Sequence, residues 1–264
     1  MEAHIPGLAP DAVVHVGGLS ITNTMVNSVL ALSIFIVIGI VVRSRAKLRP
    51  GAFQNGIEFF LETLLGYFDQ VTGDRKKTLK FLPIVGSVFF FILLSNWLGL
   101  LPGTGTITSG HAPLLRPANT DLNLTLAMAL VAVISSHVFG FISVGFFTHA
   151  NKFIQLGTLV KSLRHGPVAI FVALVEVVVG LIEIASELSK VFSLSLRLFG
   201  NIFAGEVLIS VIGSIAILLV PAPFMLLEIL VGLIQAAVFS ILTLVYMTVA
   251  SSAPHGGDEA EAHH

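Results

Sequence analysis

Apolar runs long enough to cross a bilayer recur along this chain, and no other feature constrains its fold as strongly. The first run, residues 25–42, reads MVNSVLALSIFIVIGIVV and approaches the ~20 residues that span a membrane as a helix. Hydrophobic residues make up 55% of the 264-residue sequence and charged residues only 11%, whereas globular proteins average about 25% charged residues. So few charges cannot cover the surface of a soluble protein of this length, so we predict a membrane protein.

Two more spans and one surface helix follow the first run. Residues 81–101 and 122–147 are again almost continuously apolar. Between the first and second spans, residues 51–77 carry apolar side chains at helical spacing, with acidic side chains among them. Basic blocks flank this stretch on both sides. We therefore expect an amphipathic helix that lies on the membrane surface.

The last apolar region, residues 168–250, indicates two long helices. No proline interrupts residues 168–219, and about fifty helical residues measure roughly 75–80 Å. The hydrocarbon core is only ~30 Å thick, so this helix must be steeply tilted or broken. Pro221 and Pro223 then turn the chain into a second helix, residues 224–250.

These elements predict an all-α, polytopic membrane protein. It has an N-terminal spanning helix, a surface amphipathic helix, a two-span hairpin and two long tilted helices. We expect one membrane domain over residues 25–250, between an N-terminal outside tail, residues 1–24, and a polar, disordered C-terminal tail, residues 251–264.

Basic residues gather on one side of the predicted spans. The opposite loops hold only Arg116, and Lys190 and Arg197 lie within the last apolar region. The rule that basic loops stay in the cytoplasm places the N-terminus outside and the C-terminus inside. The basic side comprises Arg43, Arg45, Lys47, Arg49, Arg75, Lys76, Lys77, Lys80, Lys152, Lys161 and Arg164.

Arg197 stands among leucines and phenylalanine, where a charge that arginine cannot lose is costly. On an ideal helix, Ser193 and Asn201 lie about 40° to either side of Arg197, and Glu183 returns to the same stripe. Glu206 lies about 180° away, on the opposite face. The helix is therefore expected to show Arg197 to one partner and Glu206 to another.

Polar positions on the last helix suggest a partner for the Glu206 face. Glu228 and Gln235 are seven residues apart and point the same way. If the last helix packs on the Glu206 face, these three side chains form an internal polar pocket. Pairs of intramembrane carboxyls are typical of proton relays.

Other charges in this region favour a structural interpretation. Lys190 has the spacing of an ion pair with Glu187 or Glu183, and isolated charges inside a membrane can form structural ion pairs. Nothing nearby in sequence neutralises Arg197 or Glu206, so a structural ion pair is the weaker interpretation for those two.

Several function classes are excluded by composition and motif content. The chain has no cysteine, and its formal net charge of -1 gives no sign of nucleic-acid binding. No catalytic nucleophile with its base and no metal-binding motif is present, so an intramembrane hydrolase is excluded. A stand-alone ion channel or secondary transporter stays open as the alternative, although no internal repeat is evident.

Three motifs together resemble the subunit a family of rotary ATP synthases. They are LSLRLFGNIFAGE, which ends at Glu206, EILVGLIQAAVFSILTLVYM, which begins at Glu228, and PANTDLNLTLAMAL, which contains Asp121. The resemblance covers about residues 25–250, and the order and spacing of the motifs agree with the family.

The resemblance implies a stator subunit beside a rotating ring of c subunits, each with a mid-membrane carboxyl. Two aqueous half-channels reach the ring from opposite sides, and Arg197 matches the essential arginine that prevents a proton short-circuit between them. By the same resemblance, Asn201, Glu206, Glu228 and Gln235 line the outer half-channel, Glu183 and Ser193 lie near the inner one, and Asp121 is an outer carboxylate.

The remaining implications concern partners and chemistry. The family partners are the c-subunit ring, the peripheral-stalk b subunits, other ATP synthase subunits and the lipid bilayer; no cofactor or metal is implied. The expected location is the inner membrane of a bacterium, with the mitochondrial inner membrane as the less favoured alternative. Some members pair the carboxylate at Glu206 with a histidine where this chain has Glu228. We therefore expect Glu206 and Glu228 to share one proton.

Overall fold

The computed structural model describes six α-helices, one short 3-10 helix and two small antiparallel hairpins. The helices are α1 (Asn23–Arg45), α2 (Ala52–Thr72), α3 (Arg75–Gly99), η1 (Ala118–Thr120), α4 (Leu122–Val144), α7 (Pro167–Ile215) and α8 (Pro221–Ser251). The strands are β1 (Ala12–Val16), β2 (Leu19–Thr22), β3 (Thr108–Ser109) and β4 (Ala112–Pro113). The described residues are 7–16, 18–47, 50–101, 108–109, 112–113, 115–145, 167–215 and 220–252.

The helix starts follow from capping residues in the sequence. Thr22, Asp74 and Asp121 precede α1, α3 and α4, and each accepts a backbone N–H of the first turn with a side-chain oxygen. Pro221 opens α8 at its first position, where the missing N–H of proline costs nothing. Local sequence therefore fixes where these helices begin.

The expected all-α membrane fold is confirmed. Four helices, α1, α3, α4 and α8, are long and apolar enough to cross a membrane. The buried residues of α1 are confined to its first three turns, and apolar side chains such as Ile36 and Ile40 are exposed along the rest of it. In a membrane protein such a surface faces lipid, so only the N-terminal end of α1 joins the packed interior.

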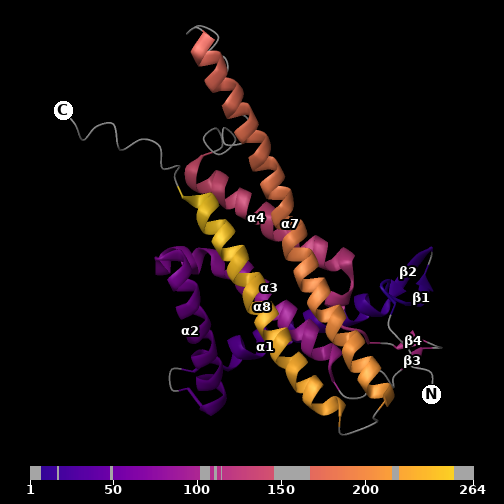
Figure 1. Cartoon of the computed structure of the whole chain (residues 1–264). Helices are drawn as coiled ribbons and strands as arrows, with labels where there is room; N and C mark the ends of the chain where they lie inside the picture. Colours follow the sequence, from indigo (N-terminus) through magenta and orange to yellow (C-terminus); the bar gives the residue numbers. More distant parts are fainter. Residues whose placement is uncertain are drawn as a thin grey trace.

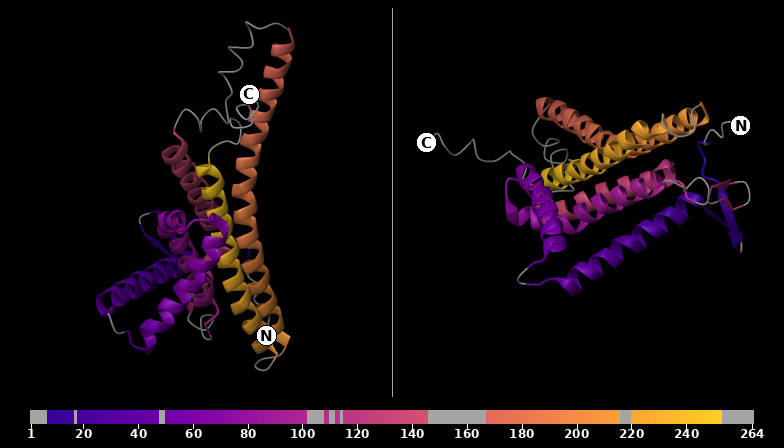
Figure 2. Two further views of the ribbon diagram at one scale, coloured as in Figure 1. Left: turned by 90° about the vertical axis from the view of Figure 1, so that its left-hand side faces the viewer. Right: turned by 90° about the horizontal axis from the view of Figure 1, so that it is seen from below.

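The core lies among α3, α4, α7 and α8. Aromatic and aliphatic side chains from all four helices meet there, including Phe81, Phe89, Val133, Leu198 and Phe239. In Figure 1, α7 runs alongside α4 and α8, and its N-terminal end projects beyond both. Figure 2 (left) shows the same projection from the side. The long helix is thus unbroken from Pro167 to Ile215, which leaves tilting as the way to fit it to a bilayer.

The predicted amphipathic helix exists as α2. Leu64 and Phe68 are buried against the core, whereas Phe53 and Phe59 are almost fully exposed. Gly73 ends the helix with a left-handed backbone (φ 67°), which glycine adopts without strain. The exposed side chains of Phe53 and Phe59 agree with a helix that lies at a lipid or protein surface.

The segment before α1, which we expected to be a tail, contains two paired strands. β1 and β2 pair as an antiparallel hairpin, with Val16 opposite Leu19. At the other end, α8 continues to Ser251, so the C-terminal tail begins after that helix. The rest of that tail, residues 253–264, and the expected basic loop, residues 148–166, lie outside the described residues.

Candidate functional site

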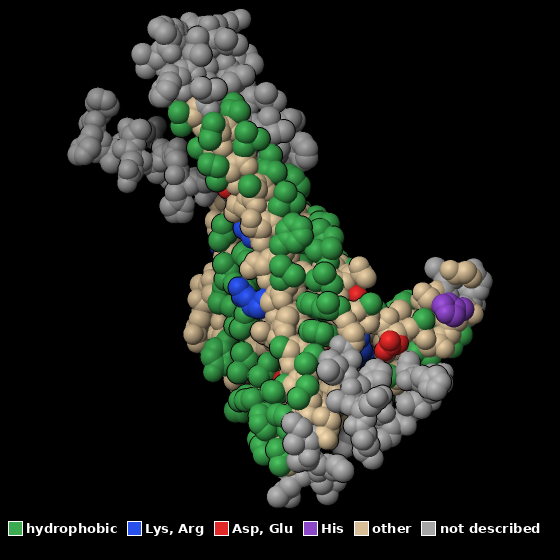
Figure 3. All heavy atoms as spheres, turned by 45° about the vertical axis from the view of Figure 1, so that its right-hand side comes forward, with side chains coloured by type: hydrophobic (Ala, Val, Ile, Leu, Met, Phe, Trp, Pro, Cys, Tyr) green, Lys and Arg blue, Asp and Glu red, His purple; other side chains and the backbone are tan. Residues whose placement is uncertain are grey.

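The two faces of α7 differ in the way that the helical spacing predicts. Leu194 and Leu198 are fully buried against the core, while Ser193 and Arg197 point outward and are exposed. The Arg197 guanidinium donates to the Ser193 hydroxyl at 3.5 Å, a long hydrogen bond. Within the described part of the chain, no carboxylate forms an ion pair with Arg197. Figure 3 shows one face of the molecule, which is largely hydrophobic, with a few Lys and Arg atoms among apolar side chains.

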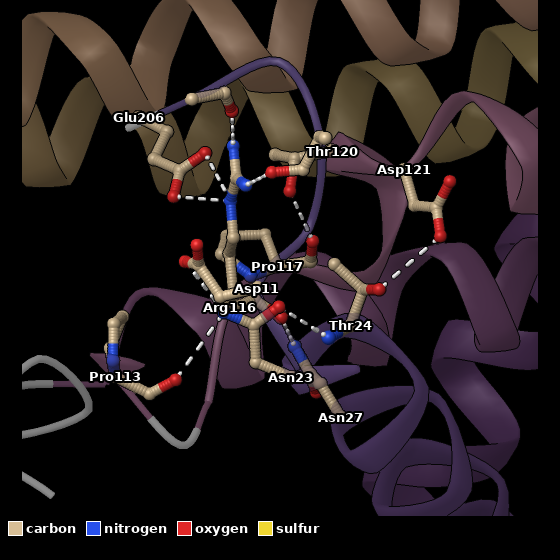
Figure 4. A network of polar contacts seen from close by, with 12 residues as sticks. Asp11, Asn23, Thr24, Asn27, Pro113, Arg116, Pro117, Thr120, Asp121 and Glu206 are labelled. Atoms are coloured by element: carbon tan, nitrogen blue, oxygen red, sulfur yellow. Dashed lines mark hydrogen bonds and ion pairs between the residues drawn. The ribbon is translucent and has the colours of Figure 1, made fainter. Parts of the chain in front are cut away.

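On the other side of α7, Glu206 pairs with a residue that its sequence neighbourhood does not reveal. Arg116, just before η1, donates from Nε to both Glu206 carboxylate oxygens, at 2.8 and 3.0 Å. Arg116 is only 3% exposed and Glu206 18% exposed, so the ion pair is largely withdrawn from solvent. The two residues are 90 positions apart in sequence, and Figure 4 shows them facing each other.

The two Nη atoms of Arg116 each donate a hydrogen bond as well. Nη1 donates to the Ala9 carbonyl at 3.2 Å and Nη2 to the Gly7 carbonyl at 2.8 Å. The guanidinium carbon lies 5.9 Å from the centre of the Phe203 ring, within cation–π range. The backbone carbonyl of Arg116 accepts from the Asn27 side chain at 2.7 Å. Arg116 therefore joins α1, α7 and the N-terminal segment at one point.

Glu228, on α8, packs against α7 at Gly205, the residue that precedes Glu206. The carboxylate of Glu228 occupies the space beside Gly205, where even a methyl group would overlap it. Glu228 is 7% exposed, and its Oε1 has no hydrogen-bond partner within the described chain. Its side chain is thus buried in a place that glycine leaves open.

Gln235, two turns further along α8, reaches the Arg197 side of α7. Its Oε1 accepts from Asn201 Nδ2 at 2.8 Å, and the residue is 4% exposed. Both Glu228 and Gln235 therefore face α7, as their seven-residue spacing predicts. The pairing of Gln235 with Asn201, rather than with Glu206, was not expected from the sequence.

A buried amide chain between these two positions was missed in the sequence. Asn119 donates to Asn96 Oδ1 at 2.7 Å, and Asn96 donates to the Gly232 carbonyl at 3.4 Å. Trp97 donates to the Ile229 carbonyl at 3.1 Å. The signal in the sequence was an asparagine inside the second apolar span, where an unpaired amide would be costly.

Asp121 takes a local structural role in addition to its expected place at the outer side. Its Oδ1 accepts the backbone N–H of Asn123 at 2.9 Å, which caps α4. Its Oδ2 accepts from the Thr24 hydroxyl at 3.3 Å, which joins α4 to α1. Figure 4 shows this bond beside the Arg116 contacts.

The opposite half of α7 carries a second ionic cluster. Lys190 Nζ lies 2.5 Å from Glu187, which confirms the ion pair expected from their spacing. Sequence reasoning gave His137 no part, but His137 on α4 lies 3.4 Å from the same carboxylate. Lys190 also lies 5.2 Å from the ring centre of Tyr246 on α8. Glu183, one turn earlier, is only partly buried.

A family model described as the ATP synthase A chain matches residues 24–248, which include every polar contact of α7 and α8 described above. The chain belongs to the ATP synthase A chain family. Subunit a of Moorella thermoacetica ATP synthase is 30% identical over 239 residues, covering 90% of this chain and 94% of the relative. Subunit a of Mycobacterium ulcerans is 32% identical over 237 residues, covering 87% and 86%.

A third relative, ATP synthase subunit a 2 of a Bradyrhizobium strain, is 30% identical over 236 residues and covers 89% of this chain. Together with four apolar helices of spanning length, family membership makes the chain a multi-pass membrane protein associated with ATP synthesis and proton transport. The resemblance of the three motifs to this family is therefore confirmed.

Proposed function

We propose that this chain is the stator subunit that conducts protons to and from a ring of c subunits in an F-type ATP synthase. The observation that carries the proposal is Arg197: an exposed arginine, set in an apolar face, with no carboxylate partner within the described chain. A permanent charge in lipid is costly unless a partner neutralises it. A ring of helices with one carboxyl each supplies that partner.

The polar residues of α7 fall into two groups on either side of Arg197. Glu206 lies nine residues toward the C-terminus, about 13 Å along the axis, and Glu183 lies fourteen residues toward the N-terminus, about 21 Å away. In the proposal the outer half-channel contains Glu206, Glu228, Asn201 and Gln235, with Asp121 at its mouth. The inner half-channel runs past Glu183 and Ser193.

Arg197 then serves as the electrostatic separator. Its charge favours the ionised form of each passing ring carboxyl, so the proton is released to one half-channel before the carboxyl meets the other. A lysine in the same place could give up its proton, whereas arginine holds its charge. The separation of outer and inner groups along α7 leaves Arg197 as the only charge between Lys190 and Glu206.

The basic ends of the helices support an orientation. Arg43 and Arg45 end α1 and Lys76 and Lys77 begin α3, while Arg116 lies beyond the other end of α3. We assign the first set to the cytoplasm of a bacterial cell and the N-terminus and Arg116 to the outside. The peripheral-stalk b subunits are further partners in this arrangement. The stand-alone channel or transporter is less favoured, because the family match spans residues 24–248.

The test is Arg197→Ala in the whole ATP synthase, with ATP-driven proton pumping measured in membrane vesicles. We expect pumping to be lost while the complex assembles, because Arg197 is exposed and makes one long hydrogen bond among the described residues. Arg75→Ala is the matched control, since Arg75 is also exposed but is the first residue of α3 and pairs with Asp69. Substantial pumping by the Arg197 variant would refute the proposed function.

A further inference from the structure

The geometry points to different roles for the two carboxyls of the outer group: Glu206 is a fixed anion locked to Arg116, and Glu228 alone carries the proton there. This inference rests on the proposed function and deepens it. It replaces the expectation of one proton shared between Glu206 and Glu228, which assumed that no cation faced Glu206. Arg116 and Glu206 are then positioning residues.

Hydrogen bonds to one carboxylate and two backbone carbonyls hold the Arg116 guanidinium in position. Nε holds both oxygens of Glu206, and the two Nη atoms hold the carbonyls of Gly7 and Ala9. Arginine does not release its proton in a protein. Protonation of Glu206 would therefore strand a buried cation, an outcome that costs far more than keeping the pair ionised. A group tied in this way is poorly suited to gain and lose protons in each transport cycle.

Glu228 has the opposite surroundings. Its carboxylate lies beside Gly205, and one of its oxygens accepts no hydrogen bond within the described chain. No cation of the described residues forms an ion pair with it. On α3, Asn96 and Trp97 donate to the Gly232 and Ile229 carbonyls just after Glu228, and neither side chain carries a charge. Glu228 can change its protonation state without breaking an ion pair, which is what a relay group needs.

The N-terminal segment before α1 contacts the ion pair of Arg116 and Glu206. The carbonyls of Gly7 and Ala9 accept hydrogen bonds from the two Nη atoms of Arg116. The same segment is tied to α1, since the Asn23 backbone N–H donates to the Asp11 carbonyl at 3.0 Å and the Asn23 side chain donates to the Asp11 carboxylate at 3.4 Å. Figure 4 shows Asp11, Asn23 and Arg116 in one network. The residues before α1 therefore hold the Arg116 side chain in place.

The test compares Glu206→Gln, Arg116→Gln and the double variant in the assembled ATP synthase, with ATP-driven proton pumping as the readout. Each single variant leaves one buried charge without its partner, so we expect each to lose most of the pumping. The double variant removes both charges, and we expect it to recover a large part of the lost rate. Recovery is impossible if Glu206 itself carries protons, so an assembled double variant as inactive as Glu206→Gln would overturn the inference.

A second measurement does not depend on transport. It tests the inference even if the double variant fails to assemble. Infrared difference spectra between mildly acidic and mildly alkaline buffer report carboxyls that gain a proton. We expect Glu228→Gln to remove part of the protonated-carboxyl band and Glu206→Gln to leave that part in place. Loss of the same part of the band in Glu206→Gln would also overturn the inference. The Arg197→Ala experiment tests the proposed function separately, because the spectra of Glu228→Gln and Glu206→Gln do not depend on Arg197.

Discussion

Two arginines of this chain have opposite surroundings. Arg116 is 3% exposed, and its side chain donates to a carboxylate and two backbone carbonyls. Arg197 is exposed and makes one hydrogen bond of 3.5 Å to Ser193. All three nitrogens of the Arg116 guanidinium donate within the chain, whereas one nitrogen of the Arg197 guanidinium does so among the described residues.

In the proposed function, this difference separates a structural charge, Arg116, from a functional one, Arg197. A buried ion pair holds segments together and fails badly when one partner is removed. An exposed arginine in an apolar face adds nothing to the packing of its own chain, and its cost is recovered only when a partner arrives. Stability measurements should therefore respond to the loss of Arg116 and not to the loss of Arg197.

The largest effect on stability is expected from Arg116→Ala. It leaves the Glu206 carboxylate buried without its cation, a loss of about 3–5 kcal/mol. We expect a strongly lowered thermal midpoint of the purified complex, or little of this chain in it. Arg197→Ala, the matched control, should keep the midpoint of the parent. Equal midpoints for the two variants would remove the distinction between the two arginines.

Gly205→Ala should come next. A methyl group there overlaps the Glu228 carboxylate, the end of a flexible side chain that must move aside, and overpacking of this kind costs about 1–3 kcal/mol. Gly213→Ala on the same helix is the control, because a Cβ at Gly213 meets open space. Combining Gly205→Ala with Glu228→Asp shortens the carboxylate and should restore part of the loss in thermal stability. No rescue would indicate that Gly205 matters for another reason.

Lys190→Met should have a smaller effect. Lys190 bonds Glu187, but the side chain is 27% exposed, so we expect a loss of about 1.5 kcal/mol, the lower end for hydrogen bonds to charged groups. Lys76→Met, at an exposed position of α3, is the control for losing one positive charge. Thermal unfolding of both variants measures the difference. A variant as stable as Lys76→Met would show that His137 compensates for Lys190.

The smallest effect concerns Asp69 and Arg75, between α2 and α3. The Thr78 hydroxyl beside Asp69 and the Arg75 guanidinium at 2.6 Å lower the pKa of the Asp69 carboxyl, against a weaker opposing effect of burial. A lowered pKa contributes stability above the pKa of the unfolded state, and this contribution is lost as pH falls through the folded pKa. Arg75→Ala should therefore lower thermal stability slightly at neutral pH and not in strong acid. A difference that grows toward acid would contradict this sign.

The fold could be predicted because its determinants are local. Apolar runs set the spans, basic blocks mark their ends, and Thr22, Asp74 and Pro221 mark helix starts. The two faces of α7 also followed from helical geometry, since burial of Leu194 and exposure of Ser193 depend only on position around one helix.

The contacts of the site could not be predicted, because they join distant segments. Arg116 looked like an isolated loop charge, and only the packing of the loop before η1 on α7 brings it to Glu206. The role of Gly205 is likewise invisible in sequence, since a glycine in an apolar helix gives no sign that a carboxylate from α8 fills its space. The link from Asn119 through Asn96 to α8 depends on three segments meeting.

The central claim, that the Arg197 face of α7 meets the ring, can be tested by disulfide formation. The chain has no cysteine of its own, so a single introduced cysteine reports one position. Ser193→Cys lies on the exposed face, whereas Ser195→Cys, two residues away, is 1% exposed and contacts Thr125 at 3.1 Å. Each variant is paired with a cysteine next to the ring carboxyl. We expect a strong cross-link from position 193 and none from 195; a cross-link from 195 without one from 193 would contradict the claim.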